Sequence, residues 1–388
     1  MKQNLTLHFN SDISQSTMSK HKIIDLLYHD FGYFYNIDYE PNIKWPDHGI
    51  IPFVCIDTQM LITELQILIT QFRDKCINIS QNIIFFLHRE FVPVDVVNKI
   101  TQLLSLCPNS LLTKIKIIVN GYTNYIESKY KHVFLNINFF DRYLYMLSEM
   151  PLEVHGQSMF LIKKTYDHII NERQYKFSTF IGQISRGRYH RAKYFYKCFN
   201  EYLLDEDHFW SLICIDYFDT MRTFQHAIGN KETNNIQHMI KHKVVKENGD
   251  FLTSSDHIYN DHYEYQVPEQ MRNSYINVVL ETTEDIPCVT EKIYKPIIAG
   301  IPFIWYGNKN ICNFLTRQGY KLYPFIDYTF DSIDSSQERL NVLIQEMKRL
   351  KLLNLKQLIH QTLQISTYNR YNFFNNAKYM SELQPFLL

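Results

Sequence analysis

The sequence predicts an α/β protein of two lobes, each built around a mainly parallel β-sheet. Short apolar runs alternate with helical stretches over residues 20–150, and a second alternation of the same kind begins near residue 176. Strands that alternate with helices form βαβ units, whose strands lie parallel in one sheet. A chain of 388 residues can also hold two domains of ordinary size, each with its own core.

The first lobe is predicted at residues 1–165. Its strands are apolar runs such as GIIPFVCID and NIIFFLHRE, and its helices are the longer stretches between such runs. The predicted strands lie at 49–57, 82–90, 114–121 and 132–140, and the predicted helices at 60–75 and 93–105.

The second lobe is predicted at residues 166–350, and a helical segment is predicted to follow at 351–388. The predicted strands lie at 176–184, 210–216, 275–281 and 301–306, and the predicted helices at 188–204, 291–299 and 309–318. Residues 224–272 are polar and are predicted to form loops and short helices. From residue 335 onward apolar residues recur at helical spacing, which predicts long C-terminal helices.

The composition argues against several classes of protein. The formal net charge is zero, so no basic surplus indicates a nucleic-acid partner. The seven cysteines are scattered without a C-x-x-C pair, which favours reduced thiols over a metal site. No apolar run is long enough to span a bilayer, and the N-terminus lacks the apolar core of a signal peptide. We therefore expect a soluble protein of the cytoplasm.

An acid-base pair, Glu291 and Lys292, stands at the start of the helix predicted at 291–299. Thr290 is the expected N-cap of this helix, so the pair would lie where ligands bind in α/β lobes, beyond the carboxyl ends of the strands. A carboxylate can accept hydrogen bonds from ribose hydroxyls, and a lysine can neutralise phosphate. The alternative is that Glu291 only complements the helix dipole and Lys292 is solvated.

A group of basic residues lies between the strand predicted at 176–184 and the next helix. The segment holds Ser185, Arg186, Arg188 and Arg191. Like charges at the positive end of a helix dipole repel it, and a bound diphosphate would remove that conflict. A solvated, charged turn is the alternative. Neither G-x-x-x-x-G-K-[ST] nor G-x-G-x-x-G is present, so a P-loop ATPase or a standard dinucleotide enzyme is not supported.

Three blocks in order, "ISRGRYHRAKYF", "SYINVVLETTEDIPCVTEKIYKPIIAGIPFIWYG" and "LTRQGYKLYPFIDYTFDSI", carry a family resemblance over roughly residues 176–335. The chain resembles phage- and giant-virus-associated glycosyltransferases. It is more distantly similar to the α1,3-fucosyltransferases, which have a T-E-K-[LI] motif before an apolar helix. The resemblance implies a GT-B architecture of two Rossmann-like lobes. It also implies a nucleotide diphosphate sugar as co-substrate, with no cofactor and no essential metal, and a host cytoplasm or virion as the location if the protein is viral.

The resemblance also implies roles for single residues. Glu291 would hold the ribose or sugar of the donor, Lys292 and Arg191 the diphosphate, with Arg186 and Arg188 in support. The fucosyltransferases usually have tyrosine three residues before the motif glutamate, where this chain has Cys288. The nucleotide base and the sugar therefore stay open.

An inverting transfer requires a general base that deprotonates the acceptor hydroxyl. The first candidate is Glu90, at the end of NIIFFLHRE and before FVP, which faintly resembles the F-E-S-P segment of fucosyltransferases. The second is Asp57, at the end of PFVCID. Both could instead be solvated carboxylates at strand ends, and His88 beside Glu90 could be structural.

Two further acidic groups are ambiguous. Asp205 and Asp207 form a D-x-D pattern, by which metal-dependent GT-A transferases hold manganese, although a solvated loop is the simpler interpretation. Asp327 and Asp331 follow the last predicted strand, where they could line the donor cleft or cap the following helix.

The leading hypothesis is a glycosyltransferase that moves a sugar from a nucleotide diphosphate donor to a glycan or other hydroxyl acceptor, by inversion and without a metal. A non-catalytic binding protein of the same fold and a metal-dependent GT-A transferase are the alternatives. The candidate catalytic residues are Glu90 and Asp57, and the predicted donor site comprises Ser185, Arg186, Arg188, Arg191, Thr290, Glu291, Lys292 and Asp327.

Overall fold

The computed structural model describes residues 3–8, 35–40, 50–55, 58–75, 82–87, 94–119, 130, 133–136, 153–154, 157–158, 173–181, 184, 188–212, 217–237, 267–284 and 289–373. The contacts within the chain divide it into two compact units. The first comprises Met1–Met146 with Asn375–Leu388, and the second comprises Leu147–Phe374. The predicted boundary after residue 165 lies outside the described residues, and the one after residue 350 falls in the last turn of a helix.

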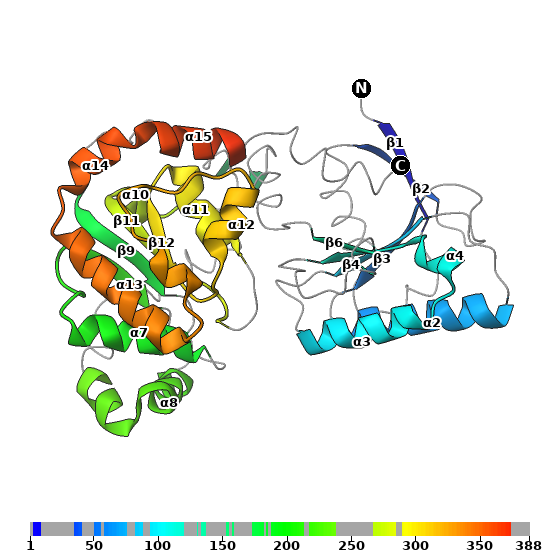
Figure 1. The fold of residues 1–388 in the computed structure, drawn as a ribbon, viewed down its shortest axis with the longest axis horizontal. Coiled ribbons are helices and arrows are strands. Elements are labelled where there is room, and N and C mark those ends of the chain that lie inside the picture. Colours follow the sequence, from blue (N-terminus) through cyan, green and yellow to red (C-terminus); the bar gives the residue numbers. More distant parts are fainter. Residues whose placement is uncertain are drawn as a thin grey trace. The chain divides into compact units, whose positions relative to one another are not determined.

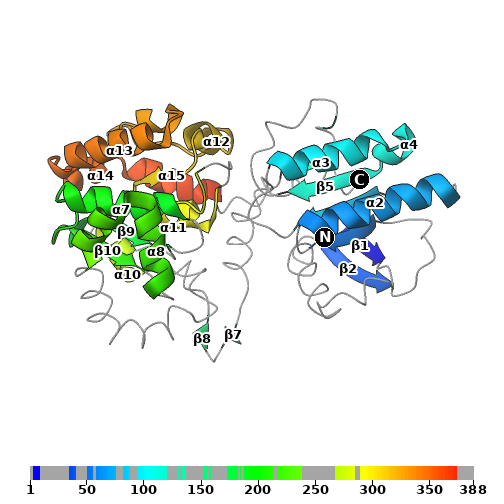
Figure 2. The same ribbon diagram turned by 90° about the horizontal axis from the view of Figure 1, so that it is seen from below.

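The first unit contains a six-stranded sheet in the order β2-β1-β3-β4-β5-β6, and all of its strand pairs are parallel. Helices α2 and α3 lie along one face of this sheet (Figures 1 and 2). Its elements are β1 (Gln3–His8), β2 (Tyr35–Glu40), β3 (Ile50–Cys55), α2 (Thr58–Lys75), β4 (Asn82–Leu87), α3 (Val94–Ser105), α4 (Asn109–Leu112), β5 (Ile115–Val119) and β6 (Phe134–Asn136).

The core of the first unit forms between the two long helices and the central strands. Leu65 of α2, Phe85 of β4, Ile100 of α3 and Ile117 of β5 are all fully buried in one cluster. These are the apolar positions that the helical and strand patterns predict to face a common interior. Strands β1 and β2 are not among the predicted strands, because QNLTLH and YNIDYE alternate apolar with polar residues and lack a continuous apolar run.

The second unit is built on a four-stranded parallel sheet in the order β10-β9-β11-β12. Two short strands, β7 and β8, form a separate antiparallel pair. The elements of the unit are β7 (Glu153–Val154), β8 (Gln157–Ser158), β9 (Tyr175–Ile181), α7 (Tyr189–Asn200), β10 (His208–Leu212), α8 (Tyr217–Ile228), α10 (Glu269–Arg272), β11 (Ser274–Leu280), α11 (Glu291–Ala299), β12 (Phe303–Tyr306), α12 (Ile311–Arg317), η4 (Thr329–Ser332), α13 (Ser336–Lys351), α14 (Leu355–Gln361) and α15 (Leu363–Phe373).

The order of these strands creates a topological switch point. From β9 the chain crosses through α7 to β10 on one side, and from β11 it crosses through α11 to β12 on the other side. Right-handed crossovers in opposite directions place their helices on opposite faces of the sheet. Figure 1 accordingly shows α7 and α13 below the sheet of the second unit and α15, which packs on α11, above it. Ligands of such sheets bind at the carboxyl ends of the two strands that flank the switch point.

The structure confirms the predicted fold class, an α/β protein with parallel sheets and C-terminal helices. The helix predicted at 291–299 is confirmed, whereas α7 ends at Asn200 rather than at residue 204. Helix α8 was not predicted as a separate helix, and the polar stretch from residue 224 begins inside it. Within the described part of the chain, no helix is long and apolar enough to cross a membrane.

Candidate functional site

The candidate site lies at the switch point, where β9 and β11 end side by side. The register aligns Asn277 with Ser178 and Val278 with Thr179, and Asn277 Nδ2 donates to Ser178 O at 3.1 Å. Three segments therefore meet at this edge: the first turn of α7, the loop that follows β11, and the first turn of α11. Each carries polar or charged residues.

Glu281, the first residue after β11, is the centre of this meeting point. Its side chain is fully buried. Oε1 accepts from the Thr290 N–H at 3.1 Å, and Oε2 accepts from the Thr290 hydroxyl at 2.7 Å and from the Thr282 N–H at 3.3 Å. A buried carboxylate is tolerated only when such donors replace water. Glu281 thereby fixes the loop between β11 and α11. It was missed from the sequence, where it appears only as the last residue of a predicted strand.

Thr290 and Lys292 occupy the start of α11 as expected. Thr290 is the N-cap, and its Oγ1 accepts from the Lys292 N–H at 3.4 Å, which confirms the predicted cap. Lys292 is half-buried, and its Nζ lies 3.2 Å from Thr290 Oγ1 and 3.4 Å from Thr282 Oγ1. The ammonium is therefore held beside the loop after β11, at the N-terminus of a helix. Two sources of positive potential coincide there.

Arg191 is buried, and its guanidinium reaches from α7 to the end of β11. Nε and one terminal nitrogen donate to Glu281 O at 3.3 and 3.2 Å, and the same terminal nitrogen lies 3.5 Å from Leu280 O. Arg188, the N-cap residue of α7, is half-buried. The structure therefore gives Arg191 a structural function in joining α7 to β11, and its predicted contact with a diphosphate stays a prediction.

His190 is the neighbour of Arg191 and is buried beside the same carbonyl. Its Nε2–H donates to Glu281 O at 2.8 Å, and its ring meets the Tyr306 ring edge-on with the centroids 6.1 Å apart. Burial lowers the pKa of His190 to about 4, although the hydrogen bond to Glu281 O opposes this shift. The positive charge of Arg191 lowers the pKa further, and the carboxylate of Glu284 raises it.

The lowered pKa predicts a loss of stability in acid. An unfolded histidine takes up its proton near pH 6.5, whereas the folded one resists protonation down to about pH 4. Between these values the unfolded state binds more protons, so stability falls as the pH falls. From pH 7.5 to 5 we expect His190 to contribute a loss of about 2 kcal/mol in the free energy of unfolding.

The measurement is urea unfolding of the wild type and of His190→Gln at both pH values. The glutamine amide preserves a donor at the position of Nε2 but does not titrate in this range. The variant should lose about 2 kcal/mol less than the wild type between the two pH values. Equal losses in both proteins would show that folding does not lower the pKa of His190, so that the folded protein already carries the proton at pH 5.

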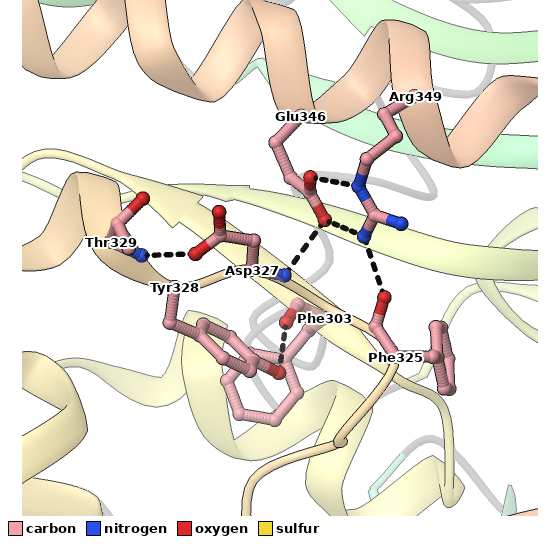
Figure 3. A network of polar contacts seen from close by, with 7 residues as sticks. All are labelled: Phe303, Phe325, Asp327, Tyr328, Thr329, Glu346 and Arg349. Atoms are coloured by element: carbon pink, nitrogen blue, oxygen red, sulfur yellow. Dashed lines mark hydrogen bonds and ion pairs between the residues drawn. The ribbon is translucent and has the colours of Figure 1, made fainter.

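Asp327 and Asp331, two candidates at the end of the second lobe, both make local hydrogen bonds, and the predicted donor contact of Asp327 stays a prediction. Asp327 Oδ1 accepts from the Thr329 N–H at 2.9 Å, and the Asp327 N–H donates to buried Glu346, which also binds Arg349 (Figure 3). Asp331 was expected to line the cleft or to cap the helix that follows it. The cap of the following helix is wrong, because Ser335 is the N-cap of α13. The Asp331 carboxylate caps the preceding helix α12, where it accepts from two backbone N–H groups, each at 2.9 Å.

Both aspartates of the D-x-D pattern form ion pairs with lysines. Asp205 pairs with Lys351 at the end of α13, and Asp207 lies 3.1 Å from Lys176 Nζ. The described residues contain no group of three or more histidine, cysteine or acidic side chains that could hold a metal ion. Both carboxylates lie in the loop before β10, at the opposite edge of the sheet from the switch point.

The remaining predicted residues cannot be placed in this arrangement. Glu90, Asp57, Ser185 and Arg186 lie outside the described residues, as do His88 and Cys288. For Glu291 the structure describes the backbone, as the first residue of α11. Their predicted roles stay predictions.

No protein-family model and no curated protein matches the chain. Among solved structures, an α1,3-fucosyltransferase with GDP-fucose is similar at 11% identity and a TM-score of 0.46, over 100% of this chain and 91% of that chain. The same type of enzyme with GDP gives 12% identity and a TM-score of 0.45, with the same coverage. A UDP-forming trehalose-phosphate synthase from Burkholderia xenovorans gives 12% identity and a TM-score of 0.41, over 87% of this chain and 73% of that chain.

Proposed function

We propose that this protein is a glycosyltransferase that binds a nucleotide diphosphate sugar at the switch point of its second unit. The observation that carries the proposal is that Arg191 and Lys292 meet at the end of β11, beside the N-termini of α7 and α11, with Arg188 as the N-cap residue of α7. A doubly negative diphosphate is the ligand that this combination of cations and helix N-termini suits.

The same groups suit the chemistry of transfer. When the sugar leaves, negative charge develops on the departing nucleoside diphosphate, and fixed positive groups stabilise it. The N-terminus of α11 is held in place because Glu281 binds its N-cap Thr290. Preorganised donors of this kind need little rearrangement as the charge develops. Glu291, as the first residue of α11, is proposed to bind the ribose or the sugar.

One exposed aromatic residue lies on an element that forms this edge. Tyr189 begins α7 and is 43% exposed, and its ring meets His226 of α8 edge-on. Large aromatic side chains exposed at a site edge offer flat surfaces for a nucleotide base or a sugar ring. Tyr189 is therefore compatible with a ligand that has a ring as well as an anionic part.

The acceptor is proposed to be a glycan or another hydroxyl compound, and the reaction an inverting one that needs no metal. Glu90 and Asp57 remain the proposed candidates for the general base. Both residues lie outside the described residues, and they are proposed from the sequence pattern and the resemblance.

The test is a thermal-shift screen of the full chain with GDP, UDP, TDP and CDP, with and without EDTA. A nucleoside diphosphate at a hundred times its Kd should stabilise the protein by about 2.7 kcal/mol, or a rise in Tm of roughly 5–10 °C for the second unit. We expect one of the four to do this and EDTA to leave the rise unchanged.

Lys292→Met serves as the matched variant, because it retains a long side chain but removes the ammonium. Its Tm without ligand should stay close to that of the wild type, and its ligand-induced rise should shrink. If none of the four nucleotides shifts the wild type, the proposed donor site is wrong. A shift that disappears with EDTA would favour a metal-dependent transferase.

A further inference from the structure

Glu284 forms a second polar cluster beside the switch point, in the loop after β11. Its Oε1 accepts from the Tyr306 hydroxyl at 2.8 Å and also from the Ser336 hydroxyl. Tyr306 is the last residue of β12, and Ser336 is the first residue of α13. The cluster therefore connects three elements that are far apart in the sequence.

Two hydroxyl groups determine how the Glu284 carboxylate is oriented. Each hydroxyl has a single proton, and Oε1 is the carboxylate oxygen that lies within hydrogen-bond distance of both hydroxyls. Burial, with the charge of Glu284, raises the pKa of the fully buried Tyr306 well above its usual range, so its phenol remains a donor. The two hydroxyl oxygens lie 2.9 Å apart, on the same side of the carboxylate. Glu284 is thus held in one orientation by donors on one of its two oxygens.

The second oxygen, Oε2, is left as an acceptor. No described residue donates a hydrogen bond to it, and none forms an ion pair with Glu284. Arg339, the arginine whose charge also acts on Tyr306, donates from one terminal nitrogen to Ile333 O at 2.6 Å. A half-buried carboxylate with one oriented, unused oxygen is suited to a neutral ligand with hydroxyl donors.

Glu284 is also linked to the basic residues through Tyr306. Tyr306 donates to Glu284 at 2.8 Å, and its ring meets the ring of His190, the neighbour of Arg191, with the centroids 6.1 Å apart. Two loops of the chain also approach each other closely here. A Cβ on Gly307 would lie 2.8 Å from Glu281 Cβ and 3.0 Å from Thr283 O. Glycine is required at such a contact, which brings the loop after β12 against the loop after β11. Glu284 therefore belongs to the same group of packed loops as the basic residues.

We propose that Glu284 binds the sugar of the donor, with Oε2 accepting hydrogen bonds from its hydroxyl groups. This inference rests on the proposed function and adds a specificity-determining residue to that site. Tyr306 and Ser336 are positioning residues that fix the carboxylate. A carboxylate in this role discriminates between sugars by where their hydroxyls point, and it makes no contact with the nucleoside diphosphate.

The test compares two ligands on one variant. Glu284→Gln retains a carbonyl oxygen for Tyr306 and Ser336, and it replaces the free acceptor by an amide donor. The nucleotide sugar is GDP-fucose if the wild type binds GDP, and UDP-glucose if it binds UDP. We expect the Kd of Glu284→Gln for this nucleotide sugar to rise about tenfold or more. Its Kd for the free nucleoside diphosphate should stay within about twofold. Glu338→Gln, at an exposed acid of the first turn of α13, is the matched control and should change neither Kd.

The outcomes separate the two proposals. If the wild type binds no nucleoside diphosphate, the proposed function is wrong. If the wild type binds both ligands and Glu284→Gln weakens neither, or weakens both equally, only the role of Glu284 is overturned. If Glu284→Gln does not fold, Tyr306→Phe takes its place, because it removes one of the two orienting donors. It should then weaken the nucleotide sugar about threefold and spare the diphosphate, and equal effects on the two ligands would overturn the inference.

Discussion

Replacement of Glu281 by alanine is expected to lower the free energy of unfolding of the second unit by about 3 kcal/mol, which corresponds to a Tm roughly 6–12 °C lower. The Thr290 N–H and the Thr290 hydroxyl both donate to this carboxylate, and Thr290 is fully buried. Without Glu281 these donors lose their acceptor where water cannot replace it. An unsatisfied buried donor costs about 1–3 kcal/mol.

Urea unfolding followed by circular dichroism measures this loss. Glu281→Gln is the matched control, because it preserves the shape and one acceptor oxygen, and it should lose about half as much. An unfolding free energy of Glu281→Ala within about 0.5 kcal/mol of the wild type would show that the loop between β11 and α11 is not fixed by this residue.

Arg191→Ala is expected to have two effects of similar size. Loss of the buried guanidinium removes its hydrogen bonds to Leu280 O and Glu281 O and leaves a cavity, which should lower the free energy of unfolding by about 3 kcal/mol. The same change should weaken nucleoside diphosphate binding by about 2 kcal/mol, the order of a charge-assisted contact. Urea unfolding and calorimetric titration measure the two effects separately.

Arg188→Ala separates folding from binding in the same helix turn. Arg188 is half-buried whereas Arg191 is buried, so removal of Arg188 should lower the free energy of unfolding by less than the removal of Arg191 does. Its loss should still weaken diphosphate binding about tenfold. If folded Arg191→Ala binds the diphosphate as tightly as the wild type, Arg191 is a structural residue only, and the phosphate-binding role remains with Arg188 and Lys292.

The periodic patterns of the sequence were sufficient to predict most of the fold. Helix α11 begins at Glu291 and ends before Gly300, which adopts a left-handed φ of 65°, and its cap and its apolar face are both local signals. Strands with continuous apolar runs, such as β4, were equally easy to predict from the sequence. The strands β1 and β2 were not, since short runs with alternating polarity occur in many loops as well.

The sequence predicted which types of residue form the candidate site, but it did not predict which residues contact one another. Arg191 binds a carbonyl 90 positions later in the chain, and Ser336 binds Glu284 across 52 positions. Such contacts depend on how the elements pack, and no local pattern encodes them. Glu281 and Glu284 were missed for the same reason: the sequence does not show which donors an acid at or after the end of a strand will meet. For Asp331 the sequence offered the cleft or the helix after it and not α12, because the approach of α12 depends on tertiary packing.

Hydrogen exchange of the full chain, measured with and without the nucleoside diphosphate that binds it, tests the central claim most directly. A ligand at the carboxyl ends of β9 and β11 should slow the exchange of backbone N–H groups at residues 188–192, 281–284 and 289–292. Protection confined to other segments, with these unchanged, would contradict the account and move the ligand away from the switch point.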